Sequence, residues 1–212
     1  MDNFENKFLS ISHDDSLSDR EKTYKQAERL IDIEKICKDS VVVDIGSNFG
    51  EVIRALTSTN CKVYGFEPHP LFYEMLVSEY SDNKNIILSN SAVWVNKEKR
   101  KFYFKKSQTA LNGGATLMSD KLNINRRHKL EVDCIDIAEF INQIGFVDVL
   151  KIDVEGAEYE LLYRLYQSGA YKNVRSIYFE DHSRKMVTNR FFALKQEVIA
   201  KYEEVEKELY WW

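Results

Sequence analysis

Apolar runs rich in β-branched residues alternate with helical segments through the first half of the chain. Val41–Ile45 is such a run, and a helix is expected to follow it from about Gly50 to Ser58. Val63–Glu67 is the next run, and it precedes a helix over about Leu71–Tyr80. The order of strand, helix and strand with short links predicts right-handed βαβ units and a parallel sheet. Continuous apolar runs are typical of parallel strands that are buried on both faces.

The second half repeats this order after an interruption. A third strand is predicted from Ile86 towards Trp94, and residues 94–135 are predicted to form a β-rich insertion. Its antiparallel strands are expected near 102–104 and 130–135, on either side of a polar stretch at Asn112–Gly114. Further elements are expected as helices over 137–144, 158–167 and 189–201, strands over 147–152 and 174–179, and a closing strand within 202–212. The predicted fold class is α/β, with a mainly parallel central sheet and helices on both faces.

Length and charge limit the functions that this chain can have. The 212 residues predict one domain, 1–212, whose first 38 residues form an arm and a helix. A net charge of −4 argues against a dominant nucleic-acid surface, and no apolar run is long enough to cross a bilayer. The scattered cysteines Cys37, Cys61 and Cys134 suggest reduced thiols, so a cytoplasmic location is expected.

A glycine-bearing turn follows the first strand. Its spacing is Asp-x-Gly-x-x-x-Gly, which differs from the Gly-x-Gly-x-x-Gly of dinucleotide-binding turns and matches enzymes that use S-adenosylmethionine (SAM). The alternative is an ordinary helix-entry turn. The cofactor-binding candidates in this turn are Asp44, Gly46, Ser47, Asn48, Phe49 and Gly50.

Two later strand ends add cofactor-binding candidates. Glu67 lies 23 positions after Asp44, where an acid can accept hydrogen bonds from both ribose hydroxyls, and Pro68 follows it. The alternative is an exposed acid at a helix start. Ser91 and Ala92 lie where polar groups at a strand end could hold an adenine edge.

Ionisable residues gather after the strands at 147–152 and 174–179. Because the carboxyl ends of parallel strands share one edge of the sheet, these residues are expected to meet. Asp153, Glu155 and His182 are the candidates for a general base, and Asp153 is also a cofactor-binding candidate. A divalent metal, Mg²⁺ or Mn²⁺, is a variant with Asp153, Glu180 and Asp181 as ligands. The alternatives are helix capping by the acids and a surface histidine.

Two basic clusters fall within the predicted insertion. One covers Lys97–Lys106 and the other Arg126–Lys129. Such clusters are usually solvated faces. The functional alternative is an acceptor-binding surface for an anionic or sugar-rich substrate.

Taken together, Val43–Gly50, Phe66–Pro68, Ala92–Val93 and Leu150–Glu158 resemble the FkbM family of methyltransferases. The Lys-x-Asp-x-Glu-Gly-x-Glu stretch from Lys151 to Glu158 is the most specific part. The resemblance implies a Rossmann-like class I methyltransferase fold, SAM as methyl donor and O-methylation. It also implies a hydroxyl acceptor on a sugar or glycan, such as a deoxyhexose like rhamnose or fucose, and a glycosyltransferase as a partner.

Three other functions remain open from the sequence. They are a SAM-binding module without catalysis, an NAD-dependent oxidoreductase on a Rossmann fold, and an RNA or protein methyltransferase, which the acidic charge balance disfavours for RNA. The turn spacing and the charged residues from Lys151 to Glu155 count against the oxidoreductase. The chain departs from the usual fold at its carboxyl end. Only about ten residues remain after the last predicted helix, too few for the usual antiparallel strand pair.

Overall fold

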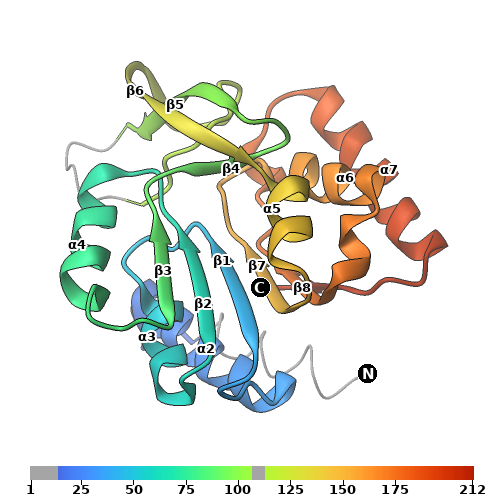
Figure 1. The fold of residues 1–212 in the computed structure, drawn as a ribbon. Helices are drawn as coiled ribbons and strands as arrows, with labels where there is room; N and C mark the ends of the chain where they lie inside the picture. The colour runs from blue at the N-terminus through green and yellow to red at the C-terminus, as the bar shows by residue number, and fades with distance from the viewer. Residues whose placement is uncertain (1–13, 107–112) are drawn as a thin grey trace.

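The computed structural model describes residues 14–106 and 113–212, so most of the predicted arm and Asn112 lie outside it. Within those residues, the main sheet has six strands in the order β3-β2-β1-β7-β8-β9, and all neighbouring pairs are parallel (Figure 1). The strands are β1 (Val41–Ile45), β2 (Lys62–Phe66), β3 (Ile86–Ser89), β7 (Val147–Ile152), β8 (Val174–Phe179) and β9 (Leu209–Trp211). This arrangement confirms the predicted parallel α/β fold.

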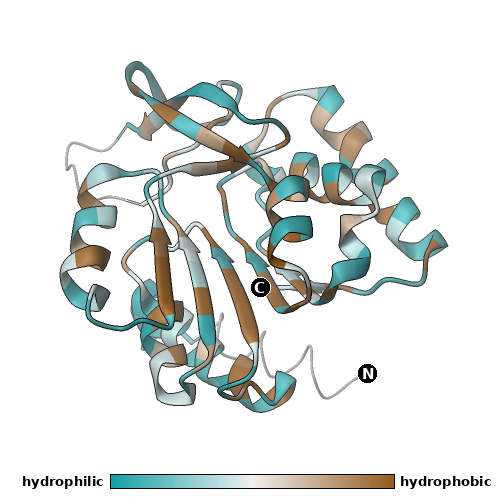
Figure 2. Ribbon diagram, in the orientation of Figure 1, coloured by the Kyte–Doolittle hydropathy of each residue, from teal (hydrophilic) through white to brown (hydrophobic). Residues whose placement is uncertain are grey.

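Helices cover both faces of the sheet, because successive strand side chains point to opposite faces. Val42 packs in one apolar cluster with residues of α2, α3 and α4, whereas Val43 packs in another with residues of α5, α6 and α7. β3 and much of β1 are brown in Figure 2, as expected for a buried sheet. The helices are α2 (Asp19–Glu34), α3 (Glu51–Leu56), α4 (Pro70–Tyr80), α5 (Ile137–Ile144), α6 (Glu158–Ser168) and α7 (Asn189–Glu204), with 3₁₀ turns η1 (Thr57–Thr59), η2 (Ala170–Asn173) and η3 (Ser183–Lys185).

The insertion forms a second sheet above the carboxyl ends of the main strands (Figure 1). Its order is β4-β6-β5, with β4 (Ala92–Trp94), β5 (Glu98–Lys105) and β6 (Ile124–Asp136). β5 and β6 pair antiparallel, which confirms the β-rich insertion. The expectation of one strand from Ile86 to Trp94 is wrong. β3 ends at Ser89, where the Asn90 side chain bonds the Glu67 carbonyl, and β4 then pairs with β6.

The carboxyl end of the chain closes the sheet edge with one short strand. β9 pairs parallel with β8, and Trp212 N donates to the Phe179 carbonyl. Within the described residues, β9 is the edge strand of the main sheet beside β8. In the same part of the chain, no helix combines the length and the apolar character that a membrane span needs.

Candidate active site

A cavity of about 500 Å³ lies at the carboxyl ends of β1, β2 and β7. Gly46, Glu67 and Asp153 line it from the main sheet, and Phe102 and Gly114 line it from the insertion. Its volume falls within the range of small-molecule sites in proteins. Ligands of open parallel sheets bind at this edge, so the cavity is the first candidate for a functional site.

The turn after β1 is held tightly against its neighbours. Gly46 N and Ser47 N both donate to the Phe66 carbonyl at 3.0 Å. Gly46 has φ +84°, and a Cβ atom there would lie 1.9 Å from the Asp153 carbonyl oxygen. Only glycine fits this conformation and this approach. The turn therefore brings the ends of β1, β2 and β7 to one point.

Glu67 is the acid that this turn surrounds. Its Oε2 accepts from Asn48 N at 2.8 Å and its Oε1 accepts from His69 N at 2.7 Å. Glu67 is 6% exposed, so it is not the exposed helix-start acid of the alternative interpretation. Burial raises the pKa of Glu67 to about 7, against the lowering effect of the two backbone donors.

Most of the predicted cofactor-binding residues meet at the cavity, and two do not. Asp44 is fully buried behind the turn, 3.3 Å from Lys151 Nζ. Gly50 packs under α4, where a Cβ atom would lie 2.5 Å from Leu76 Cδ2. The predicted residues that line the cavity are Gly46, Ser47, Asn48, Phe49, Glu67, Pro68, Ser91, Ala92 and Asp153.

Lys151 connects the strand ends electrostatically. Its Nζ lies 3.3 Å from Asp44 Oδ1 and 3.3 Å from Asp153 Oδ2. Burial opposes its charge, but the two carboxylates outweigh burial and raise the pKa of Lys151. Burial also raises the pKa of Asp153 to about 6, with Lys151 acting in the opposite direction. Asp153 therefore titrates close to neutral pH.

The pKa of Glu155 is shifted in the opposite direction from that of Asp153. Lys121 Nζ lies 2.6 Å from its Oε2, and Lys185 Nζ and His182 Nε2 lie 3.3 and 3.2 Å from the same atom. Burial alone would raise the pKa of Glu155, but His182 and Lys121 lower it to about 2. A carboxylate held so firmly in its charged form is a weak proton acceptor at neutral pH. The contacts therefore disfavour Glu155 as the general base.

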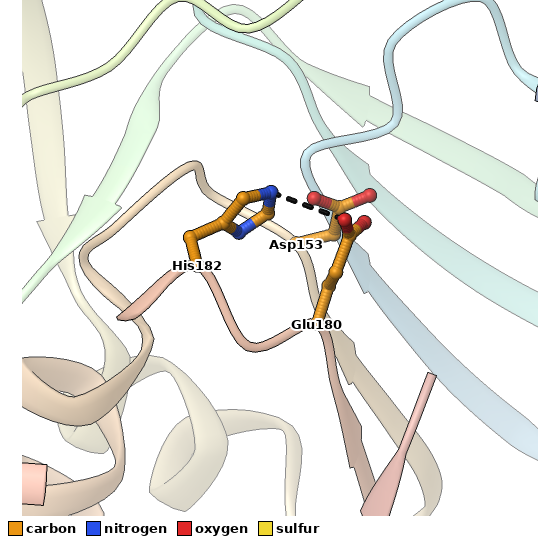
Figure 3. A group of neighbouring side chains, drawn as sticks. All are labelled: Asp153, Glu180 and His182. Atoms are coloured by element: carbon orange, nitrogen blue, oxygen red, sulfur yellow. Dashed lines mark ion pairs between the residues drawn. The ribbon is translucent and has the colours of Figure 1, made fainter. Parts of the chain in front are cut away.

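His182 is 2% exposed, so it is not a surface histidine. Its Nδ1 lies 2.8 Å from Glu158 Oε1. Its Nε2 lies 3.2 Å from Glu180 Oε1, the pair marked in Figure 3. Burial opposes the charge, but the bonds with Glu158 and Glu180 raise the pKa of His182 to about 10. An imidazole that is already protonated at neutral pH cannot accept a proton, which argues against the predicted role of His182 as base.

Two of the three predicted metal ligands, Asp153 and Glu180, lie together, but the third residue beside them is His182 and not Asp181. One atom each of Asp153, Glu180 and His182 lie within 4.8 Å of one another, close enough to share a cation (Figure 3). Asp181 is not part of this group. Its carboxylate accepts from Lys195 Nζ at 2.6 Å and from Ser183 Oγ at 2.9 Å, so it is bound to α7 and η3 instead.

Sequence reasoning gave no role to several side chains of the site. Glu158 is fully buried and accepts from Gly156 N at 3.0 Å as well as contacting His182. Its position in the motif was visible in the sequence, but its contacts were not. Lys121 had no sequence signal, because its proximity to Glu155 arises only when the insertion folds over the sheet.

An aromatic wall also lines the cavity, and of its residues only Phe49 was predicted from the sequence. His69 stacks on Phe72 with ring centroids 4.3 Å apart, and Phe49 lies 4.4 Å from Phe72. All three line the cavity. Aromatic faces of this kind can stack on a base or pack against the C–H groups of a sugar.

The known proteins that are similar to this chain include methyltransferases. The family model of the methyltransferase FkbM domain matches residues 44–205. No curated protein matches the chain. A SAM-dependent O-methyltransferase from Thermotoga maritima is similar in structure, with TM-score 0.43 and 13% identity over 85% of this chain and 49% of that protein. The chain thus spans about half the length of that protein.

A second solved structure is the precorrin-6y C5,15-methyltransferase from Geobacter metallireducens GS-15. It has TM-score 0.45 and 12% identity, over 87% of this chain and 70% of that protein. With TM-scores below 0.5, these two similarities carry no argument, so the assignment depends on the family match. That match covers the turn after β1, Glu67 and the Lys151–Glu158 stretch in one continuous segment. The chain belongs to the FkbM methyltransferase family.

Proposed function

We propose that this chain is a SAM-dependent O-methyltransferase. The observation that carries the proposal is the pairing of the glycine turn with a buried acid, since Asn48 N donates to Glu67 within the cavity. Each carboxylate oxygen of Glu67 can accept a second hydrogen bond, as a ribose diol would require. SAM, when bound, supplies an electrophilic methyl group on a sulfonium centre.

The residues present fit such a cofactor. Asn48 Oδ1 is buried and has no hydrogen-bond partner among the described residues, and it can accept from an ammonium group. Pro68, Ser91 and Ala92 line the part of the cavity beside Glu67, where we place the adenine. The turn at Gly46 and Ser47 would lie beside the amino-acid end. The carboxylates nearby favour a cationic sulfonium.

The acceptor that we propose is a hydroxyl of a sugar or glycan, such as a deoxyhexose. The support is the family membership and the polar lining of the cavity beyond Asp153, where Glu155, Glu180 and Lys185 can take part in hydrogen bonds. A glycosyltransferase that builds such a glycan is the partner this acceptor implies. Holding the hydroxyl in line with the methyl group supplies much of the rate increase, up to about 7–11 kcal/mol in favourable cases.

Asp153 is the residue that we propose receives the hydroxyl proton. It lines the cavity, 24% of its side chain is exposed, and its pKa is raised to about 6. A base with a pKa near the working pH combines a useful ionised fraction with sufficient basicity. Lys151 keeps Asp153 oriented, because its Nζ is shared between Asp153, Asp44 and the Gly46 carbonyl.

We favour a mechanism without a metal ion. The protonated His182 already supplies a positive charge between Glu155, Glu158 and Glu180. Methyl transfer that is unchanged after treatment with EDTA would agree with this choice. Activity that is lost on chelation and restored by Mg²⁺ or Mn²⁺ would show that the variant with a metal is correct.

The proposed function is tested by binding and by transfer. Calorimetric titration should show SAM binding, whereas NADH fluorescence should not change when the protein is added. Tritiated methyl groups from SAM should then appear on a hydroxyl among a panel of hexoses and deoxyhexoses. NADH binding in place of SAM would favour the oxidoreductase. SAM binding without transfer to any hydroxyl acceptor would favour the SAM-binding module.

A further inference from the structure

The free end of the β5–β6 hairpin carries a strong excess of positive charge. The described residues 101–106 and 121–130 contain lysines and arginines but no aspartate or glutamate, although the whole chain has a net charge of −4. We call this region the basic hairpin end. Its charged residues are Lys101, Lys105, Lys106, Lys121, Arg126, Arg127 and Lys129.

Charges at the base of the same hairpin are paired, whereas most of those at its end are not. Lys99 lies 3.8 Å from Glu131 and 3.8 Å from Asp133, and Arg100 lies 2.9 Å from Glu98. Within the basic hairpin end, Lys121 points inward and pairs with Glu155. Its other lysines and arginines form no ion pair with any residue in 14–106 or 113–212. A net positive charge therefore remains at this end.

This charge lies beside the cavity. Lys105 and Phe102 of β5 line it directly. Phe104 packs edge-on against His69 with centroids 5.2 Å apart, so β5 rests on the aromatic wall. Lys185 also lines the cavity, and its carbonyl accepts from Leu122 N at 2.7 Å, next to the second strand of the hairpin.

The cavity is consequently polarised. Glu67, Asp153 and Glu180 line it at the strand ends, where Lys151 also lines it and pairs with Asp44 and Asp153. Towards the insertion, Lys185 lines it and pairs with Glu155, whereas Lys105 lines it without an ion pair among the described residues. The acidic side suits the cationic cofactor, so the acceptor would occupy the basic side. Edge-strand lysines also protect sheets against unwanted pairing, which is a sufficient reason for Lys99 and Lys101. It does not explain a lysine on the cavity wall.

We propose that the acceptor carries an oxyanion, either a phosphate or a carboxylate, that Lys105 binds at the insertion side of the cavity. The inference depends on the proposed function in one respect, namely that this side receives the acceptor. The remaining cations of the basic hairpin end attract the acceptor over about one Debye length, ~8 Å at physiological ionic strength. A neutral sugar would gain nothing from these unpaired charges.

Direct binding tests the inference without any turnover. The full chain, saturated with S-adenosylhomocysteine, is titrated calorimetrically with glucose, glucose 1-phosphate and glucuronate at low and high salt. We expect at least one anionic probe to bind about tenfold more tightly than glucose, as one charge-assisted hydrogen bond would give, and to weaken at high salt. The two anionic probes distinguish phosphate from carboxylate. Equal affinity for all three probes, or no binding of either anion, would overturn the inference.

Matched variants locate the site. Lys105→Gln should weaken the anionic probe about tenfold while leaving the affinities for glucose and S-adenosylhomocysteine unchanged. Lys99→Gln is the control, because Lys99 lies on the same strand and is already paired with Glu131 and Asp133. An equal loss in both variants would show only general attraction to a basic protein and would contradict the site.

The outcomes also separate this inference from the proposed function. Binding of an anionic sugar through Lys105 without any methyl transfer would leave the anion site in place and refute the methyltransferase proposal. Methyl transfer to neutral sugars, with no preference for anions, would support the enzyme and refute the anion site.

Discussion

The two walls of the cavity are built in different ways. The wall at the strand ends is held by backbone hydrogen bonds between adjacent strands, such as those from Gly46 and Ser47 to Phe66. It also carries buried acids. The insertion wall shares the apolar core of the sheet through Phe102, Leu117 and Val132, and polar contacts join it to the residues that follow β7. Thr116 Oγ1 donates to the Glu155 carbonyl at 2.9 Å, and Lys121 pairs with the Glu155 carboxylate.

Under the proposed function, this difference separates two tasks. Cofactor binding requires groups in fixed positions, which adjacent strands of one sheet supply. Acceptor choice can change with the insertion while the strand ends stay the same. Glu155 connects the two walls, because its carboxylate pairs with Lys121 of the insertion and with His182, which follows β8.

The largest effect should come from the strand-end wall at Asp153. Asp153→Asn removes the proposed proton acceptor with little change in shape. We expect kcat to fall by about 10²–10⁴ while SAM affinity stays close to that of the wild type. Single-turnover methyl transfer and calorimetry measure the two quantities. Asp181→Asn is the matched control and should keep its activity, since Asp181 pairs with Lys195 outside the cavity. Full activity in Asp153→Asn would remove the assignment.

The second largest effect concerns the cofactor. Glu67→Ala deletes both proposed ribose acceptors and also the acceptor of Asn48 N. SAM affinity should fall by about 100-fold, the loss expected for two hydrogen bonds to a charged group that are only partly replaced by water. Calorimetry is the measurement, and the exposed Glu74→Ala on α4 is the control. An unchanged Kd would exclude Glu67 from the SAM site.

A smaller effect is expected where the two walls meet. Lys121→Met leaves Glu155 without its nearest cation, and Lys121 is only 5% exposed. Because Glu155 keeps Lys185 and His182, we expect a loss of about 2 kcal/mol of unfolding free energy, below the usual value for breaking a buried pair. The melting temperature should then fall by roughly 4–8 °C. The exposed Lys99→Met should shift it by much less. Equal shifts of the melting temperature in the two variants would show that the Lys121–Glu155 pair does not hold the walls together.

The smallest effect is a pH dependence of cofactor affinity. The pKa of Glu67 is raised to about 7, so ionising it costs stability in the ligand-free protein as pH rises from about 4.5 to 7. The proposed ribose contacts use the ionised form, so SAM affinity should rise with pH up to about 7 and then level off. Affinity at pH 6 should be about tenfold below that at pH 8. Glu67→Gln should remove this dependence, and a wild-type Kd that does not vary between these pH values would contradict it.

The sequence by itself determined the parallel sheet, the turn at Gly46 and the position of Glu67. These features depend on short-range spacing: a β-branched run, a glycine where φ is positive, and an acid at the end of the next strand. Neighbouring parallel strands place such residues together whatever lies elsewhere in the chain.

Only the tertiary structure decided among the charged residues. Asp153, Glu155 and His182 were equal candidates in the sequence, but the structure gives them different pKa values. Burial raises the pKa of Asp153, His182 and Lys121 lower that of Glu155, and Glu158 and Glu180 raise that of His182. For the same reason His182, and not the predicted Asp181, lies together with Asp153 and Glu180. Electrostatic interaction depends on distance and burial, and neither is encoded by local spacing when the partners are far apart in the chain.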